Sequence, residues 1–183
     1  MKKHEVYSKN TTKVTSICYT VKSCLVLWDI LPANMTLKTR SIGRLGMLHD
    51  IDFELYPEEH CSKCCELLRA HDIDEQMIRS IVSHGYGRLD WVTVAPKLHM
   101  EKILFATDEL SGLIGTCAMV RPSKSVRDMD VGSIKKKFKK KEFAVGCCRE
   151  DIVKGAEMLD ITLDELMQRT LDSMKNSVDV LNI

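Results

Sequence analysis

Apolar residues recur at spacings of three and four along most of the chain, which is the pattern of helices that bury one face. Alternation of apolar and polar residues, the pattern of a half-buried strand, is convincing only from Trp91 to Ala95. We therefore expect an all-α protein. With 183 residues the chain can close one hydrophobic core and is short for two, so a single domain over residues 1–183 is expected.

Prolines, glycines and capping residues divide the chain into helices. The expected helices cover residues 14–32, 37–50, 57–70, 72–85, 101–120, 125–141, 149–159 and a last segment from 162 onward. Pro57 suits the first position of its helix. Asp72 or Asp74 is expected to cap the next helix, and Thr162 with Glu165 forms a capping box for the last one.

Composition narrows the classes of function only a little. The 27 lysines and arginines balance 26 aspartates and glutamates, and the net charge of +1 favours neither nucleic acid nor an acidic membrane. The longest uninterrupted apolar run, Cys24–Trp28, is too short for a membrane span or a secretory signal. We therefore expect a cytoplasmic protein with no membrane partner, whose eight cysteines are reduced.

Two conspicuous motifs have ordinary explanations. The lysine run over 135–141 is typical of a solvated helix face, and only two phenylalanines lie near it, so nucleic acid is not the expected partner. Cys61, Cys64 and Cys65 contain a Cys-x-x-Cys, but together with Leu68 they follow helical spacing. No second cysteine pair stands at the distance of a zinc site, so we interpret these cysteines as core residues.

Asp108 lies in the middle of the most apolar predicted helix. An ionised carboxylate in such a place is costly unless it is paired or binds a cation. Histidines at the ends of the preceding helices are candidate partners, because imidazole and carboxylate together suit first-row transition metals. A bond to a helix N-terminus or to a lysine is the alternative explanation.

The pair His49-Asp50 follows an apolar helix end and precedes a loop, so both side chains are expected to emerge at one place. A second pair, His71-Asp72, lies between two predicted helices, where N-capping explains the aspartate. We interpret that second pair as structural. The first pair is distinguished by the ordered set that follows it: His60, His84 and Asp108.

The segment from Leu48 to Val120 contains the sequences LHDID, YPEEH, IVSHGYG and EKILFATDELSGL. In these it resembles the HD-domain metal-dependent phosphohydrolases, in particular predicted bacterial HD hydrolases and, more distantly, the branch that hydrolyses diadenosine tetraphosphate. The stretch from MVRPSKS to REDIVKGAEMLDITLDEL is similar to the C-terminal part of those predicted hydrolases. The resemblance implies an HD-domain helical bundle, with a metal-binding core over about 14–120 and additional C-terminal helices over about 121–183.

The resemblance also implies a site and a reaction. Asp50 would be the catalytic residue and would bridge two divalent transition-metal ions. His49 and Asp108 would bind the first ion, and His60 and His84 would bind the second. The candidate metals are iron, manganese, zinc, cobalt and nickel. Metal-activated water would then cleave a phosphate ester or phosphoanhydride of a small phosphorylated substrate, expected to be a nucleotide.

Other charged residues are candidates for supporting roles. Arg121 and Lys124 follow the Asp108 helix and are expected to bind a substrate phosphate, with caps or salt bridges as the alternative. Asp52, Glu59 and Glu109 flank predicted ligands and are candidates to orient histidines or to act as acid and base.

The chain departs from the family pattern at one position. The family has a further metal-ligand histidine on the first helix, and gapless alignment places Thr20 there. A threonine hydroxyl is a poor ligand for a transition metal. Two alternatives follow: an enzyme with one metal, or a degenerate HD domain that binds a nucleotide or a protein partner without catalysis. A homodimer also stays open.

Overall fold

The computed structural model describes residues 45–181, with side chains described as far as residue 176. The predicted helix over 14–32, the start of the helix over 37–50, and Thr20 lie outside the described residues. Within the described part the regular secondary structure is entirely helical, which confirms the all-α class. Residues 92–97 have no regular secondary structure, and Val92 N–H donates to the Leu89 carbonyl in the turn that precedes them.

A helical turn over residues 45–48 precedes the remaining elements. These are η1 (Pro57–Glu59), α3 (Lys63–Ala70), α4 (Glu75–Val82), η2 (Ser83–Gly85), α5 (His99–Met119), α6 (Val131–Phe138), α7 (Arg149–Met158) and α8 (Leu163–Leu181), where η denotes a short 3-10 helix.

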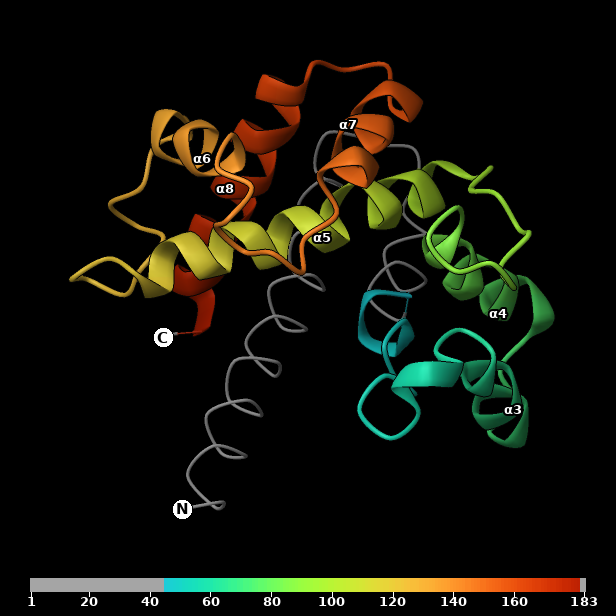
Figure 1. Cartoon of the computed structure of the whole chain (residues 1–183). Coiled ribbons are helices and arrows are strands. Elements are labelled where there is room, and N and C mark those ends of the chain that lie inside the picture. Colours follow the sequence, from blue (N-terminus) through green and yellow to red (C-terminus); the bar gives the residue numbers. More distant parts are fainter. Residues whose placement is uncertain (1–44, 182–183) are drawn as a thin grey trace, which may run out of the picture.

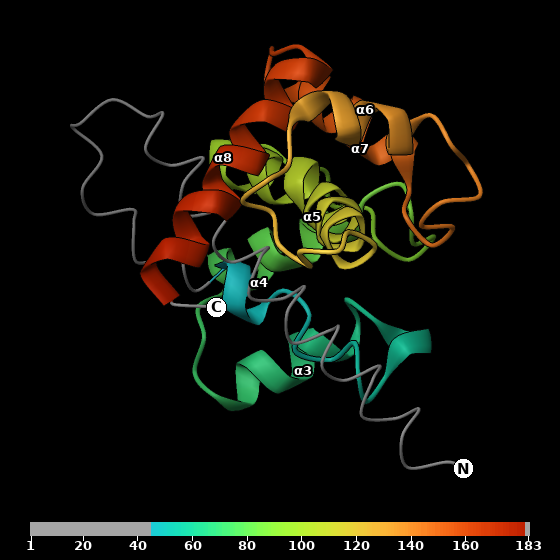
Figure 2. The same cartoon turned by 90° about the vertical axis from the view of Figure 1, so that its left-hand side faces the viewer.

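Helix α5 runs through the middle of the described fold (Figure 1). Helices α6, α7 and α8 all contact one side of it, while α3 and α4 lie toward the other side, as the turned view shows (Figure 2). Along this part of the chain, no helix is long and apolar enough to cross a membrane.

Two of the predicted caps are confirmed. The Asp74 carboxylate accepts from Met77 N at 2.9 Å and starts α4. The Thr162 hydroxyl accepts from Glu165 N at 3.1 Å and starts α8. Asp72 does not cap α4; it lies exposed after α3 with φ of 54°.

Two predicted helices differ clearly from those in the structure. The helix expected over 57–70 is broken at Cys61, whose φ of 65° is left-handed and interrupts helical hydrogen bonding between η1 and α3. The helix expected over 125–141 is shorter, because the Asp130 side chain caps it at Ser133 N (2.8 Å) and so fixes its start at Val131.

Helix α5 contributes to two hydrophobic clusters. Its first turns, including Leu104, pack with α3, α4 and Leu45, whereas its later turns, including Leu113, pack with α6, α7 and α8. Gly155 of α7 lies so close to α5 that a Cβ there would be 2.4 Å from Ala106 Cα. Asp108 is only two residues further along α5, so the packing of α7 fixes the backbone beside it.

Candidate metal centre

The five side chains predicted to bind metal come from four separate places in the chain. His49 and Asp50 follow the first helical turn, His60 follows η1, His84 belongs to η2, and Asp108 lies in the middle of α5. The structure brings all five together.

One half of this cluster centres on His49. The His49 Nε2 atom lies 3.4 Å from Asp50 Oδ2 and 3.4 Å from Asp108 Oδ1. The imidazole is buried, and its Nε2 has no hydrogen-bond partner among the described residues. A buried polar atom without a partner is costly, so this nitrogen is suited to a bound cation or proton.

The other half centres on two imidazoles. The Nε2 atoms of His60 and His84 are 3.0 Å apart. The second oxygen of Asp50, Oδ1, lies 3.6 Å from His60 Nε2 and 3.8 Å from His84 Nε2. Asp50 therefore faces both halves of the cluster, one through each carboxylate oxygen.

Each imidazole is held at its outer nitrogen. His49 Nδ1 lies 2.8 Å from the Gly46 carbonyl and His84 Nδ1 lies 2.5 Å from the Ile81 carbonyl. His60 Nδ1 lies 2.7 Å from Asp52 Oδ1. Because these oxygens only accept, each Nδ1 must carry the hydrogen and donate. In the neutral imidazoles, every Nε2 then presents a lone pair toward the cluster, the arrangement typical of metal-binding histidines.

The Nε2 atoms of His60 and His84 lie very close together, and this approach is favourable only with a positive charge near the two nitrogens. Two lone pairs 3.0 Å apart repel when no hydrogen lies between them. A divalent cation shared by the two nitrogens and a carboxylate would remove that repulsion. The described donor set, imidazole nitrogen with carboxylate oxygen, suits first-row transition metals.

Charges within the cluster shift the pKa values of its members. Burial lowers the pKa of His49, but the carboxylates of Asp50 and Asp108 outweigh it and raise that pKa to about 9. Burial, together with the charge of His49, lowers the pKa of His84 to about 3. Burial opposes ionisation of Asp108, yet the positive charge of the nearby His49 holds the pKa of Asp108 below its usual range. The cluster thus favours one positive charge at His49, where a metal ion would replace a proton.

The structure distinguishes among the three acidic residues that flank the ligands. Asp52 is fully buried and joins His60 Nδ1 to Cys64 N, which lies 2.7 Å from its second oxygen. Glu59 is exposed and lies 3.9 Å from Lys63, outside the cluster. Glu109 pairs with Arg88 and accepts from Cys148 N at 3.1 Å, so it contacts no candidate ligand in these bonds. Asp52 is therefore the one of these that orients a predicted ligand directly.

Two residues near the cluster were not among the sequence candidates. The Arg88 guanidinium lies 3.5 Å from Asp108 and pairs with Glu109, so it places a half-buried positive charge at the edge of the cluster. The Trp91 indole N–H donates to the His60 carbonyl at 2.8 Å and fixes that backbone. No local sequence motif marks either residue, because both are brought to the site by the path of the loop that follows η2.

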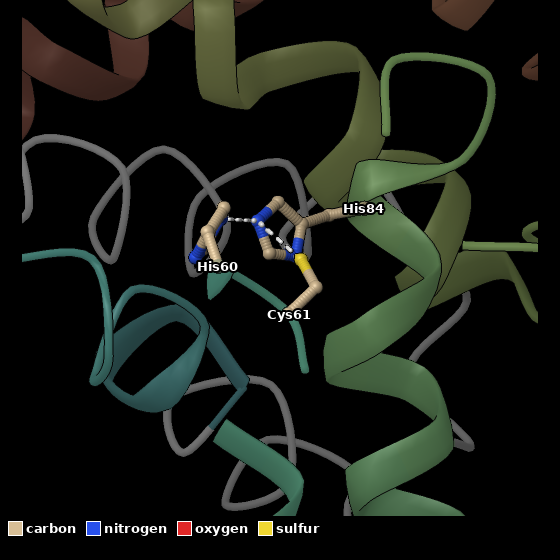
Figure 3. A group of neighbouring side chains, drawn as sticks. All are labelled: His60, Cys61 and His84. Carbon is tan, nitrogen blue, oxygen red and sulfur yellow. Dashed lines mark hydrogen bonds between the residues drawn. The ribbon is translucent and has the colours of Figure 1, made fainter. Parts of the chain in front are cut away.

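Cys61 is buried, as expected of a core residue, but its sulfur faces the cluster. The Cys61 Sγ atom lies 3.8 Å from His84 Nε2 and 4.0 Å from His84 Nδ1. Figure 3 shows the side chains of His60, Cys61 and His84 pointing toward one another. Cys64 and Leu68 are buried in the core as predicted, and Cys65 is partly buried.

The structure does not bring Arg121 and Lys124 to the cluster. They follow the far end of α5, roughly 20 Å from Asp108 along an axis that rises about 1.5 Å per residue. Arg121 is held by the Asp128 carboxylate at 3.1 Å and by its carbonyl at 2.9 Å. Lys124 lies exposed in the loop after α5. Their placement supports the alternative of structural salt bridging, at least for Arg121.

The remaining polar motifs also lie apart from the cluster. His71 and Asp72 are exposed at the end of α3, in agreement with a structural role. In the lysine run on α6, Lys135 pairs with Asp164 at 2.7 Å. A surface hollow of about 510 Å³ on α7 contains none of the predicted ligands; it is lined by Arg149, Glu150, Val153, Lys154 and Glu157.

Two adjoining groups of side chains could therefore hold metal ions. One consists of His49, Asp50 and Asp108, and the other of His60, Cys61 and His84. Comparisons of the chain with protein-family models, with curated proteins and with solved structures find no match.

Proposed function

We propose that this protein is a metal-dependent phosphohydrolase of the HD kind, acting on a phosphate ester or phosphoanhydride of a small molecule such as a nucleotide. The observation that carries the proposal is the Asp50 carboxylate, which faces His49 through Oδ2 and the pair of His60 and His84 through Oδ1. A carboxylate placed in this way suits a bridge between two cations.

The protein's own groups prepare the site for such ions. Gly46, Asp52 and Ile81 fix the three imidazoles so that every Nε2 points inward. The imidazoles are at most 5% exposed, whereas Asp50 is 26% and Asp108 is 18% exposed. Solvent and a substrate would thus reach the cluster from the carboxylate side. Bound divalent ions would supply positive charge for phosphoryl oxygens and would lower the pKa of a water molecule.

Arg88 supports an anionic substrate at the same edge. Its guanidinium lies beside Asp108 and is partly exposed. Such a planar donor binds phosphate oxygens through two hydrogen bonds. When cations neutralise Asp108, Arg88 would be freer to contact a phosphate.

Asp50→Asn tests the proposal. The amide keeps the shape of the side chain but removes its charge and one oxygen donor. We expect metal content to fall from about two equivalents per chain to one or less, and phosphate release from a panel of nucleotides to fall about 100-fold or more. Elemental analysis and a phosphate assay on the full chain measure both quantities.

The matched control is Asp72→Asn, because Asp72 belongs to the exposed second His-Asp pair and asparagine tolerates its left-handed backbone. This variant should keep the metal and the turnover. Full metal and full turnover in Asp50→Asn would remove the bridging role. Metal binding without turnover of any phosphate ester in the unmodified protein would favour a degenerate binding domain instead.

A further inference from the structure

Cys61 adds a sulfur to one half of the cluster and not to the other. Ligand atoms of His60, Cys61 and His84 all lie within 4.8 Å of one another. The other group contains only imidazole and carboxylate donors, from His49, Asp50 and Asp108. The two halves therefore differ in chemical softness.

The backbone turns Cys61 toward the cluster. In a continuous helix, neighbouring residues point about 100° apart, so His60 and Cys61 would not both face His84. The left-handed φ of 65° at Cys61 breaks the helix at this position and redirects its side chain. The same break therefore places a nitrogen and a sulfur donor from adjacent residues around one imidazole (Figure 3).

Gly85 leaves room for the sulfur. A Cβ at Gly85 would stand 3.0 Å from Cys61 Sγ and 3.0 Å from the Leu89 side chain. The residue directly after His84 thus lacks a side chain where the Cys61 thiol lies. This second observation is independent of the backbone at Cys61.

The distances suit a tetrahedral ion. Zinc bonds of about 2.0–2.1 Å to nitrogen and about 2.3 Å to sulfur imply edges of about 3.3 Å between two nitrogens and about 3.6 Å between nitrogen and sulfur. The corresponding distances are 3.0 Å between His60 and His84 and 3.8 Å between His84 Nε2 and Cys61 Sγ. Small side-chain adjustments would bring all three atoms to one ion.

We propose that Cys61 is a thiolate ligand which, with His60 and His84, makes this half of the centre selective for Zn²⁺. The thiol proton leaves to solvent as the metal–sulfur bond forms. Soft sulfur favours zinc over manganese, whereas the half formed by His49, Asp50 and Asp108 suits harder ions such as Mn²⁺ or Fe²⁺. The centre would then hold two different metals. This inference rests on the proposed metal centre and specifies the donors and metal of one half.

Cobalt substitution of the full chain tests the inference. Co²⁺ takes the place of zinc, and a cobalt–thiolate bond gives a charge-transfer absorption in the near ultraviolet that imidazole and carboxylate do not give. Under a phosphine reductant, the protein should show this band. Cys61→Ser should lose the band, and its Zn²⁺ affinity should fall about tenfold or more while its Mn²⁺ affinity stays unchanged. The matched control is Cys65→Ser, four residues along the same segment, which should keep the band.

A second variant keeps the inference testable if Cys61→Ser folds poorly. Gly85→Ala retains the thiol but crowds its sulfur, so the band should weaken without loss of a cysteine. Cobalt binding without the band, or a band that survives in Cys61→Ser, would overturn the thiolate ligand and leave the metal centre intact. Absence of cobalt binding at any concentration would overturn the metal centre as well.

Discussion

Asp52 shows how much of the candidate metal centre depends on a residue that is not itself a candidate ligand. Its carboxylate is fully buried and accepts from His60 Nδ1 on one side and from Cys64 N on the other, each at 2.7 Å. Although burial opposes it, these bonds hold the pKa of Asp52 below its usual range. Asp52 thus determines which nitrogen of His60 is free for a cation.

Replacement of Asp52 by asparagine should weaken metal binding. The amide NH₂ group must face either the His60 N–H or the Cys64 N–H, so one donor loses its acceptor. We expect metal affinity to fall roughly 10- to 100-fold, as measured by competition with a chromophoric chelator. Asp74→Asn is the control, because asparagine caps α4 as well as aspartate does. Equal affinity in both variants would mean that Asp52 serves folding alone.

At the scale of elements, Glu101 holds α4 against the start of α5. This carboxylate is fully buried, pairs with Arg79, and accepts from the Ser80 hydroxyl at 2.7 Å. It also accepts from Lys97 N at 2.7 Å and Leu98 N at 3.0 Å, the backbone that leads into α5. Since α4 leads to His84 and α5 carries Asp108, this contact positions both halves of the cluster.

Glu101→Gln should destabilise the protein by about 2–4 kcal/mol, because the partly exposed Arg79 and several backbone and hydroxyl donors lose a buried charged acceptor. Burial opposes ionisation of Glu101, but the bond from Lys97 N and the pair with Arg79 lower its pKa. The contribution of Glu101 to folding stability is therefore present above the unfolded pKa of about 4.5, and it is lost as pH falls through the folded pKa. Urea unfolding from pH 7 to pH 3 measures the difference.

The control for this prediction is Glu75→Gln. Glu75 also pairs with an arginine, Arg69 at 2.6 Å, but the pair is exposed on the surface. Solvent screening should leave the stability of this variant unchanged within error. A loss in Glu75→Gln as large as that in Glu101→Gln would show that burial is not what makes the contact important.

At the scale of the whole molecule, α5 connects two differently built halves. The cluster of metal-binding candidates lies beside the hydrophobic core of α3, α4 and the first turns of α5. The core of α6, α7 and α8 contains none of the five predicted ligands. Metal binding should therefore stabilise the two halves unequally.

Removal of metal by a chelator should lower the midpoint of thermal unfolding, because an ion at 100 times its Kd contributes about 2.7 kcal/mol to the folded state. Hydrogen exchange should quicken in peptides over residues 45–65 and 81–91, and much less in α6 and α8. Exchange measured by mass spectrometry with and without metal tests this pattern. Uniform change across all helices, or no change in the midpoint, would contradict it.

Capping residues and apolar spacing act over a few neighbours, so local sequence information was enough to predict most of the helices. The five candidate ligands were instead expected from the ordered His-Asp motif and its resemblance to the HD family, and the structure brings their side chains together. The sequence contained no local signal for Cys61, since neither its left-handed backbone nor the space that Gly85 leaves for its sulfur follows from the neighbouring residues. Arg88 likewise reaches Asp108 only through tertiary packing. The distance of Arg121 from Asp108 could have been predicted, because the rise of a helix sets it.

The contact of Gly155 with Ala106 has a consequence for protein design. Because the two backbones are this close, no larger residue fits at Gly155, and the packing of α7 holds α5 in place beside Asp108. A designer who wishes to change the surroundings of the cluster would therefore leave this helix contact untouched. The loop over residues 86–97 offers the adjustable part instead, since it carries Arg88 and Trp91 and has no regular backbone to disturb.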